Sequence, residues 1–576
     1  MGSSQSPSGR ASSRDGLRPV GIAIGVVGCV VITASSVYTA LKMGSLPWPT
    51  IFTSITALVA LRAFGRRSLN EANVTQIIMS AGSMVAGGLA FTIPGIWMLG
   101  LDGADGAGWV EMLLVAVSGT LLGLVATALI RRRFVDESDL EYPIGTAAAE
   151  TLTAAVNRGG TGKRLFASMA LAGLYSVARD VLGWVPAMLG ALPIPGVAFG
   201  VYNSPMMLSV GFLVGFGALA FAMAGAVFAN FGLVVGGVAA GLWDAATAGG
   251  IVKSLGMGLM MGSGLGVVLK DVLPRLWGMA RARRSAGEGD ASDGGARGVD
   301  AVTPAGPARR LTDLASRADA GALAVMVAAA ALAICFGLGL GPVPALAIVL
   351  LSFVTTIMSA QSVGSTGIDP MEIFGLIVLL LVAAISSTAP VRLFYVAGVV
   401  AVTCGLAGDV MSDFKTGALI GTSPRIMWVG QAIGAVLGCF VAVAVMVALH
   451  GAYGSDAFGA GKAFVAAQAS VVATMVSGIP SVPAFATGLA AGIGMYLAGL
   501  PSMMFGLGVY LPFYMPFSMF LGSLFKVVLD RVARARGVDG RTEREAGIVV
   551  ASGLLGGESI VGVLIALASV AIGLAG

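Results

Sequence analysis

Charge, histidine and cysteine are all scarce in this chain of 576 residues. Only 11% of the residues are charged, whereas soluble domains carry roughly 25%. The single histidine excludes a multi-histidine metal site, and the four cysteines stand singly in apolar runs, so neither a disulfide framework nor a zinc spacing is present. No P-loop motif occurs, which argues against ATP-driven pumping by this chain alone. We therefore expect no metal centre and no cofactor.

Apolar residues take the place of the missing charge. They make up 57% of the chain, which also has 85 glycines and a mean hydropathy of +0.92. A helix needs roughly 20 apolar residues to cross a bilayer core of about 30 Å, and runs of that length recur from Val20 onward. This pattern predicts an all-α integral membrane protein with about fourteen to sixteen transmembrane helices. Residues 20–41 are too long for a signal-peptide core, so we expect them to remain as the first helix.

The basic residues set the predicted orientation. The formal charge of +5 is spread over short connections rather than gathered on one face, so we expect no nucleic-acid partner. Arginines cluster within 10–18, 62–67 and 131–133, and these clusters alternate with an acidic loop at Asp102 and Asp105. The positive-inside rule then places the N-terminus in the cytoplasm and the chain in the cell membrane, surrounded by lipid.

Residues 275–318 interrupt the apolar pattern near the middle of the chain. Ala, Gly, Asp and Arg dominate there, which predicts a flexible cytoplasmic linker. We expect a polar cytoplasmic tail at 1–19, an N-terminal transmembrane half at 20–274 and a C-terminal transmembrane half at 319–576. Because both halves then start on the cytoplasmic side, they would be parallel rather than inverted repeats.

Short strings recur in the two halves in the same order. The pairs are 79–84 with 358–363, 144–146 with 420–422, and 200–202 with 508–510. Duplication explains ordered pairs better than chance, and repeats interrupted by glycine and polar residues are typical of secondary transporters. We expect the polar stretches at 80–83 and 360–365 to face each other across a substrate path. Gln361 stands where the first copy has Gly82, so the second copy would contribute an amide and the first would contribute room.

Two segments look too short to cross the membrane. Residues 143–156 and 417–424 both lie between basic residues that predict the same side for both ends. We expect broken or re-entrant elements there, because irregular backbone at membrane depth is tolerated only where protein or a water-filled cavity covers it.

Ionisable residues inside apolar runs are functional candidates, because burying a charge in a membrane is costly. Glu558 stands among glycines and a serine and could take up a proton; the alternative is that it pairs with a serine or a backbone amide and joins helices. Asp409 and Asp413 end an apolar run beside Lys415, where an interfacial salt bridge competes with a proton relay. Glu150 is a further candidate.

Polar residues also fall on one face of the predicted third helix. Glu71, Asn73, Gln76 and Ser80 could line a polar path for a substrate with amide or carboxylate groups. The alternative for Glu71 and Asn73 is that they cap this helix in the headgroup zone.

Several strings along the membrane portion occur in a characteristic order. They are Tyr38-Thr39-Ala40-Leu41-Lys42-Met43-Gly44, Glu71-Ala72-Asn73, Ser80-Ala81-Gly82, Phe91-Thr92-Ile93-Pro94, Gly408-Asp409, Asp413-Phe414-Lys415-Thr416-Gly417, Gly421-Thr422-Ser423-Pro424-Arg425, Gly508-Val509-Tyr510-Leu511-Pro512 and Gly557-Glu558. In this order they resemble motifs of the oligopeptide transporter (OPT) family, which includes the yellow-stripe-like metal-chelate transporters. Ala72 departs from the Glu-Asn-Asn of the family, and Gly367-Ile368-Asp369-Pro370 departs from its Ser-Asn-Asn-Pro-like string. The resemblance implies about sixteen helices in two pseudo-symmetric halves and proton-coupled uptake of small peptides or peptide-like metal chelates.

We therefore predict a proton-coupled secondary transporter that imports small peptides by alternating access. Metal chelates are the alternative substrate, and a passive channel and a membrane-embedded enzyme are the rival classes, although no clustered catalytic set is seen. A homo-oligomer is left open. The predicted substrate-binding residues are Tyr38, Lys42, Gln76, Ser80, Ser83, Gln361, Ser362, Ser365 and Tyr510. The predicted proton-coupling residues are Glu558, Glu71, Glu150, Asp409 and Asp413.

Overall fold

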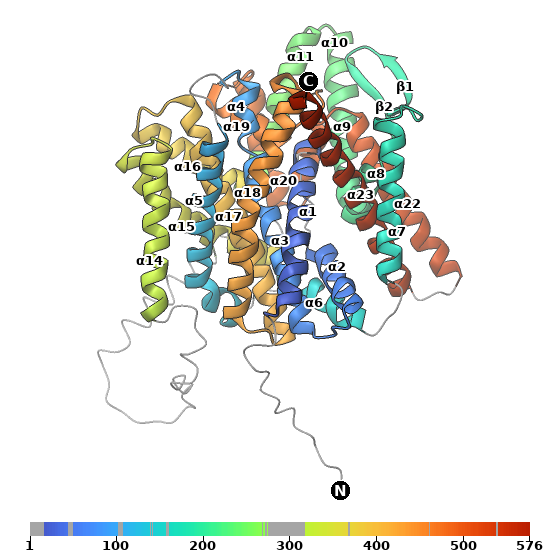
Figure 1. Cartoon of the computed structure of the whole chain (residues 1–576). Helices are drawn as coiled ribbons and strands as arrows, with labels where there is room; N and C mark the ends of the chain where they lie inside the picture. Colours follow the sequence, from blue (N-terminus) through green and yellow to red (C-terminus); the bar gives the residue numbers. More distant parts are fainter. Residues whose placement is uncertain are drawn as a thin grey trace, which may run out of the picture.

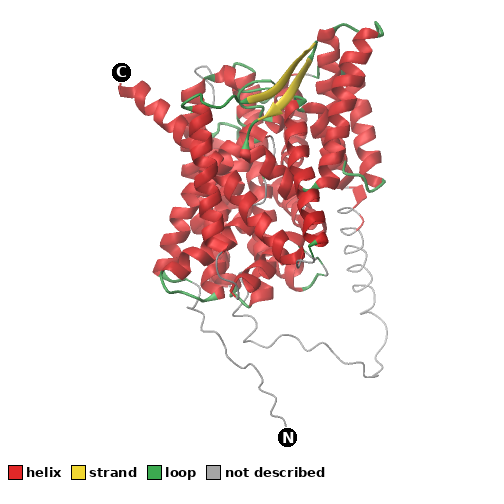
Figure 2. Ribbon diagram, turned by 90° about the vertical axis from the view of Figure 1, so that its right-hand side faces the viewer, coloured by secondary structure: helices red, strands yellow, loops and turns green. Residues whose placement is uncertain are grey.

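The computed structural model describes most of the chain. The described residues are 17–43, 46, 50–101, 108–138, 140, 142–156, 161–267, 269–270, 274, 317–366, 369–459, 461–477, 479–536 and 540–575. The predicted linker at 275–318 and the predicted tail at 1–19 lie almost entirely outside them. Within them the chain is nearly all helical, with one two-stranded sheet (Figure 2).

The elements follow one another along the chain. The helices are α1 (Pro19–Met43), α2 (Thr50–Ala63), α3 (Leu69–Ala90), α4 (Pro94–Met98), α5 (Trp109–Arg131), α6 (Pro143–Val156), α7 (Thr161–Asp180), α8 (Pro205–Val214), α9 (Phe216–Val227), α10 (Gly237–Ala239), α11 (Ala245–Val267), α14 (Arg317–Leu332), α15 (Pro342–Thr366), α16 (Met371–Ile385), α17 (Pro390–Ile420), α18 (Pro424–Tyr453), α19 (Ala467–Ser477), α20 (Val482–Leu497), α21 (Ser502–Tyr510), α22 (Tyr514–Ala535) and α23 (Gly540–Ala575). Wider or tighter helical turns are η1 (Arg132–Asp136), η2 (Phe228–Gly236), η5 (Ala333–Gly337) and η6 (Ser455–Ala457), and the strands are β1 (Met188–Ile194) and β2 (Val197–Tyr202).

Length and composition suit these helices to a membrane. Eight helical stretches among the described residues are long and apolar enough to cross one, and the first of them, Pro19–Lys42, agrees with the helix predicted at 20–41. Large apolar side chains are exposed on outer elements, such as Val325 on α14 and Phe336 on η5. An apolar outer surface is unfavourable in water but suits lipid. The fold is therefore that of an all-α membrane protein with one small sheet.

The helices form two groups that mix the predicted sequence halves. The first group is α1–α6 with α14–α19, and the second group is α7–α11 with α20–α23. Figure 1 shows α14 and α15 on one side of the molecule and α7, α8 and α22 on the other. In the first group α17 packs against α3, α5, α15 and α16; in the second, α11 packs against α20 and α21, and α8 against α22 and α23. The two groups meet where α23 packs against α1 and α18.

Glycines allow close approach of helices in the first group. A Cβ added to Gly438 of α18 would collide with the backbone of Gly82 in α3, and a Cβ on Gly434 would collide with the carbonyl oxygen of Ile78. Small residues at such contacts bring backbones together where lipid provides no hydrophobic drive for helix association. The prediction that Gly82 makes room for a substrate is therefore wrong, because α18 occupies the adjacent space.

The chain turns back between α15 and α16 beside the middle of α17. Asp369, in this turn, lies against Gly408 of α17, and Gly375 of α16 lies against Ala397 nearer the start of α17. Helix α16 therefore runs antiparallel to α17 and returns toward the end at which α17 begins. These contacts place Asp369 and the start of α16 beside the middle of α17.

Helix α6 begins beside the end of α15 and the last part of α17, and Figure 1 shows it beside α2. Tyr142, which precedes α6, donates its backbone N–H to the carbonyl oxygen of Gly364 in α15 (3.0 Å). The hydroxyl of Thr416 in α17 donates to the carbonyl oxygen of Gly145 (2.8 Å). The bounds of α6 are those predicted for the short segment at 143–156.

The other predicted short segment, 417–424, is not a separate element. Residues 417–420 are the last turn of α17, which is continuous over 31 residues. Gly421 then adopts a left-handed conformation (φ 90°) and ends the helix, and α18 begins at Pro424. Glycine takes this conformation without the steric penalty that a Cβ would add.

The β1–β2 hairpin was not predicted from the sequence. Its strands pair antiparallel with Ile194 opposite Val197, and Pro195 and Gly196 form the turn. Pro195 in the turn cannot continue a helix. Most of β1 is exposed, and the hairpin lies at one end of the molecule (Figure 2). The hairpin leads directly into Ser204 and the start of α8.

Candidate functional site

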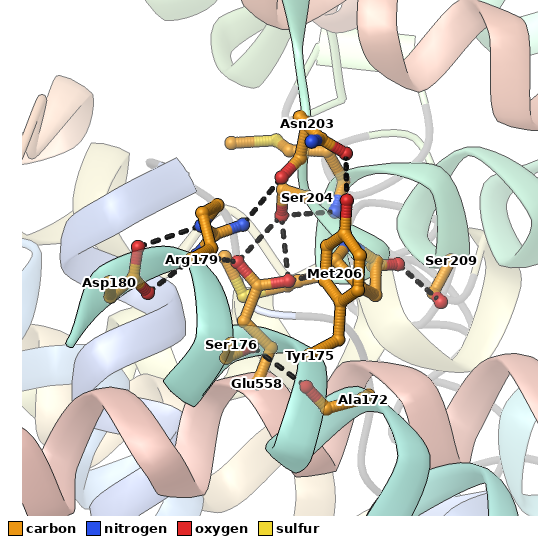
Figure 3. A network of polar contacts seen from close by, with 12 residues as sticks. Ala172, Tyr175, Ser176, Arg179, Asp180, Asn203, Ser204, Met206, Ser209 and Glu558 are labelled. Carbon is orange, nitrogen blue, oxygen red and sulfur yellow. Dashed lines mark hydrogen bonds and ion pairs between the residues drawn. The ribbon is translucent and has the colours of Figure 1, made fainter. Parts of the chain in front are cut away.

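Glu558 of α23 binds the start of α8 (Figure 3). Its Oε1 accepts a hydrogen bond from Nη2 of Arg179 (2.8 Å), and its Oε2 accepts one from the backbone N–H of Met206 (2.8 Å). The hydroxyl of Ser204 lies 2.8 Å from Oε1 and 2.9 Å from Oε2, so it can donate to either oxygen. A carboxylate at the N-terminus of a helix is stabilised by the helix dipole and by the free N–H groups.

Arg179, at the end of α7, links this carboxylate to the hairpin. Its Nε and Nη2 both lie 2.7 Å from the carboxylate of Asp180, and its Nη1 donates to the carbonyl oxygen of Asn203 (2.6 Å). Its side chain is 1% exposed and that of Glu558 is 4% exposed. Tyr175, one turn earlier in α7, donates to Oδ1 of Asn203 (2.7 Å). The geometry favours the alternative in which Glu558 joins helices rather than carrying a proton.

Sequence reasoning did not single out Arg179. Asp180 stands next to it at the end of an apolar run, and this adjacent pair of opposite charges was the available signal. The partner of Arg179 is 379 positions away on α23, and no spacing rule connects two residues so far apart. The ion pair therefore became visible only in the fold.

Lys42 faces this network from the first group. Its Nζ lies 5.7 Å from the ring centroid of Tyr202 and 5.6 Å from that of Phe464, a geometry for cation–π attraction. Tyr38, one turn earlier in α1, packs edge-on against the ring of Phe464 at 5.7 Å. Among the described residues the ammonium makes no hydrogen bond or salt bridge. Lys42 is thus a half-buried cation over two aromatic rings, and the carboxylates of Asp180 and Glu558 are its nearby negative charges.

Tyr202 connects Lys42 with the Arg179 network. It is the last residue of β2, and the guanidinium carbon of Arg179 lies 5.5 Å from the centroid of its ring. Burial raises the pKa of Tyr202 to about 12, so its phenol stays protonated near neutral pH and can donate a hydrogen bond. Lys42 belongs to the first group and Arg179 to the second, so these residues lie at the junction of the groups. We call Tyr38, Lys42, Arg179, Asp180, Tyr202, Phe464 and Glu558 the junction site.

A second polar cluster lies inside the first group, around Asp409 and Asp413 of α17. Both side chains are buried. Asp413 accepts hydrogen bonds from Nε2 of Gln76 in α3 (2.9 Å) and from Nε2 of Gln431 in α18 (2.5 Å). Oε1 of Gln76 accepts in turn from the hydroxyl of Thr53 in α2 (3.1 Å). One carboxylate of α17 thus holds α2, α3 and α18 together.

Lys415 does not neutralise this cluster. Its Nζ donates to the carbonyl oxygen of Leu140 (2.9 Å). Among the described residues it forms no salt bridge with Asp409 or Asp413, so the interfacial ion pair considered from the sequence is not formed.

The serines of the first repeat copy are engaged within their own helix. Ser80 donates to the carbonyl oxygen of Ile77 (3.3 Å), and Ser83 donates to that of Ser80. The residues from the second copy, Gln361 and Ser362, are buried in α15. Both α3 and α15 are continuous there and both pack against α17. The side chain of Ser365 lies outside the described residues.

The remaining predicted residues lie apart from the junction site. Glu71 is buried in the first turn of α3, where its backbone N–H bonds to the capping side chain of Ser68 (3.3 Å) and its carboxylate lies 4.0 Å from Arg66. The capping residue is thus Ser68, and neither carboxylate oxygen of Glu71 makes a hydrogen bond among the described residues. Tyr510 is buried at the end of α21 in the second group. The side chain of Glu150 lies outside the described residues.

Sequence comparisons show the family of the chain. A sequence model of the OPT oligopeptide transporter protein family matches residues 19–569. A protein of Haemophilus influenzae named as an oligopeptide transporter is 25% identical over 601 aligned residues, covering 92% of each chain. Shorter matches reach metal-nicotianamine transporters of Arabidopsis thaliana: YSL2 is 38% identical over 104 residues (17% of this chain, 15% of YSL2), and YSL3 is 40% identical over 93 residues (15% and 13%). Since the family model spans nearly the whole chain, which has several apolar helices suited to spanning a membrane, the chain belongs to the OPT family of multi-pass membrane transporters.

Proposed function

We propose that this protein is a proton-coupled secondary transporter that imports small peptides across the cell membrane by alternating access. In this proposal the chain makes about sixteen passages in two halves related by duplication, its N-terminus is cytoplasmic, and it acts as a carrier and not as an enzyme. The observation that carries the proposal is the ammonium of Lys42, held between two aromatic rings at the junction of the helix groups.

The junction site suits a zwitterionic substrate. Lys42 offers a positive charge that forms no salt bridge among the described residues. This charge would attract the C-terminal carboxylate of a peptide. Asp180, whose side chain is 31% exposed, offers a negative charge that would attract the peptide amine. The rings of Tyr202 and Phe464 provide apolar area beside these charges.

The location of the site supports alternating access. Lys42 and Phe464 come from the first group, whereas Arg179, Asp180 and Tyr202 come from the second. A movement of one group against the other would change the distance between the two sets of side chains. The bodies that move in this proposal are the two mixed groups, not the halves 20–274 and 319–576.

A metal chelate is the second candidate substrate. It is favoured by the matches to metal-nicotianamine transporters. Nicotianamine-like chelates also carry carboxylates that Lys42 could bind, and a chelated metal need not contact the protein.

Uptake into proteoliposomes tests the proposal. Labelled trialanine should accumulate when the outside is made acidic, and an uncoupler should abolish this accumulation. Lys42→Gln should raise the half-saturating peptide concentration at least about tenfold, the loss expected for one charge-assisted contact of about 1.5–3 kcal/mol. Lys270→Gln is the matched control, because Lys270 also lies over a tyrosine ring (5.9 Å) but outside the junction.

Competition identifies the substrate class. Unlabelled peptides should reduce trialanine uptake, and iron-loaded nicotianamine should do so only if chelates share the site. Uptake by Lys42→Gln equal to that of the wild type would refute the role of Lys42. Peptide uptake that ignores an uncoupler would refute proton coupling.

A further inference from the structure

Asp409 has a buried carboxylate that the substrate site does not use. The residue is fully buried in α17, and neither of its oxygens makes a hydrogen bond within the described part of the chain. The hydroxyl of Thr50, at the start of α2, lies close enough to interact with it. An ionised carboxylate in such surroundings would have little beyond the Thr50 hydroxyl to replace its water shell. The neutral acid is the form that fits this geometry.

Asp413, one turn further along α17, has the opposite surroundings. It accepts hydrogen bonds from the side-chain amides of Gln76 and Gln431, both of which are buried. Two amide donors solvate a negative charge, and neither can give up a proton to it. Asp413 is therefore the member of the pair whose charge neighbouring donors can stabilise, and Asp409 is the member that makes no hydrogen bond among the described residues.

The other charged groups near the pair do not supply a counter-ion. Asp369, just before α16, lies near Asp409, and Glu372 of α16 lies near Asp369; both are acids, so neither can supply a positive charge. Bases on neighbouring elements are engaged elsewhere: Arg131 with Asp136, Arg66 with Glu71, and Lys415 with the carbonyl oxygen of Leu140. Within the described residues, a proton is thus the only available means of neutralising Asp409.

The ionised form can still exist for part of a transport cycle. Helix α2 begins beside Asp409 at Thr50, so its N-terminal N–H groups and its positive dipole end lie near the carboxylate. The turn at Asp369 borders the same place, packed against Gly408. A shift of α2 or of this turn would change how well a charge on Asp409 is solvated. Such a shift would make proton uptake and release depend on conformation.

We propose that Asp409 carries the coupling proton of this transporter, with Asp413 as its hydrogen-bonded neighbour. This rests on the proposed function of proton-coupled uptake. The proton forms an O–H bond with Asp409 on the outward-facing side and leaves to water on the inward-facing side, so no other reactant is needed. Glu558 takes no part in this step, because Arg179, Ser204 and the backbone N–H of Met206 hold its carboxylate in hydrogen bonds.

Infrared spectroscopy tests the protonation without any substrate. The protein in lipid at neutral pH should show the C=O stretching band of a protonated carboxylic acid, and Asp409→Asn should lose the component of this band that Asp409 contributes. Ser412→Ala is the matched control, because Ser412 is a buried residue of α17 whose hydroxyl, among the described residues, bonds to the carbonyl oxygen of Gly408 in its own helix. Asp409→Ala serves as a second variant if the first does not fold. Identical spectra of the wild type and a folded Asp409 variant would overturn the proposal.

Transport tests the coupling. In proteoliposomes, Asp409→Asn should exchange trialanine across the membrane but lose all accumulation driven by a pH gradient, whereas Ser412→Ala should accumulate it as the wild type does. Accumulation by Asp409→Asn, or accumulation in the wild type driven by a sodium gradient alone, would overturn the proposal. If the wild type itself shows no proton-driven uptake, the proposed function fails, and the infrared result still decides whether Asp409 is protonated.

Discussion

Removing either partner of the buried Arg179–Glu558 pair should have unequal effects. Arg179→Gln leaves Glu558 charged and 4% exposed, with only Ser204 and the backbone N–H of Met206 as donors. Breaking a buried pair by removing one partner costs about 3–5 kcal/mol. Glu558→Gln leaves Arg179 bonded to Asp180 through two atoms, so only one charged hydrogen bond is lost, at about 1.5–3 kcal/mol. Arg179→Gln should be the more destabilising change.

Thermal unfolding of the purified protein in one detergent measures this difference. The apparent melting temperature should be highest for the wild type, lower for Glu558→Gln and lowest for Arg179→Gln. The double variant Arg179→Gln/Glu558→Gln should melt above Arg179→Gln alone, because it no longer buries an unpaired charge. Equal losses for the two single variants, with a double variant that is simply their sum, would refute the reasoning that the carboxylate depends on Arg179. Lys42 lies near Glu558 as well, so Lys42→Gln added to Arg179→Gln should lower the melting temperature further.

Two further pairs of variants test local contacts. Gly438→Ala should destabilise the protein by about 1–3 kcal/mol, because the new methyl group would collide with the backbone of α3. Gly494→Ala, in α20 with open space around it, should be neutral or stabilising by up to about 1 kcal/mol. The melting temperature of Gly438→Ala should therefore lie below that of Gly494→Ala. Ser204→Ala should lower the melting temperature by removing both the cap of α8 and a donor to Glu558, worth about 1–3 kcal/mol together. Ser209→Ala is its control, since that hydroxyl bonds only within α8, and equal effects of the two would contradict the capping role.

Some local elements could be predicted because they depend on neighbouring residues. The first helix was predicted at 20–41 and lies at Pro19–Met43, since an apolar run bounded by polar residues defines its own ends. The short segment at 143–156 was predicted from basic residues on both sides of it, and it is helix α6. The same charge argument did not hold for 417–424, because the helix before it is long enough to include residues 417–420.

The candidate sites depended on contacts between distant residues. The order of family-like strings pointed to Tyr38 and Lys42, but not to Arg179, and it assigned no roles to the carboxylates. Asp409, Asp413 and Glu558 are all buried acids in apolar helices and look alike in the sequence. Their surroundings differ because each packs against helices from other parts of the chain.

The sequence by itself determined that this is a helical membrane protein of the OPT family, because apolar length, scarce charge and the order of short strings are properties of the chain. Only the tertiary structure decided which helices share a group, that Lys42 faces Arg179 across the junction, and that Glu558 is paired while Asp409 is not. The physical reason is that the charge state of a buried carboxylate depends on the donors within hydrogen-bond distance. For Glu558 the donor Arg179 is 379 residues away along the chain.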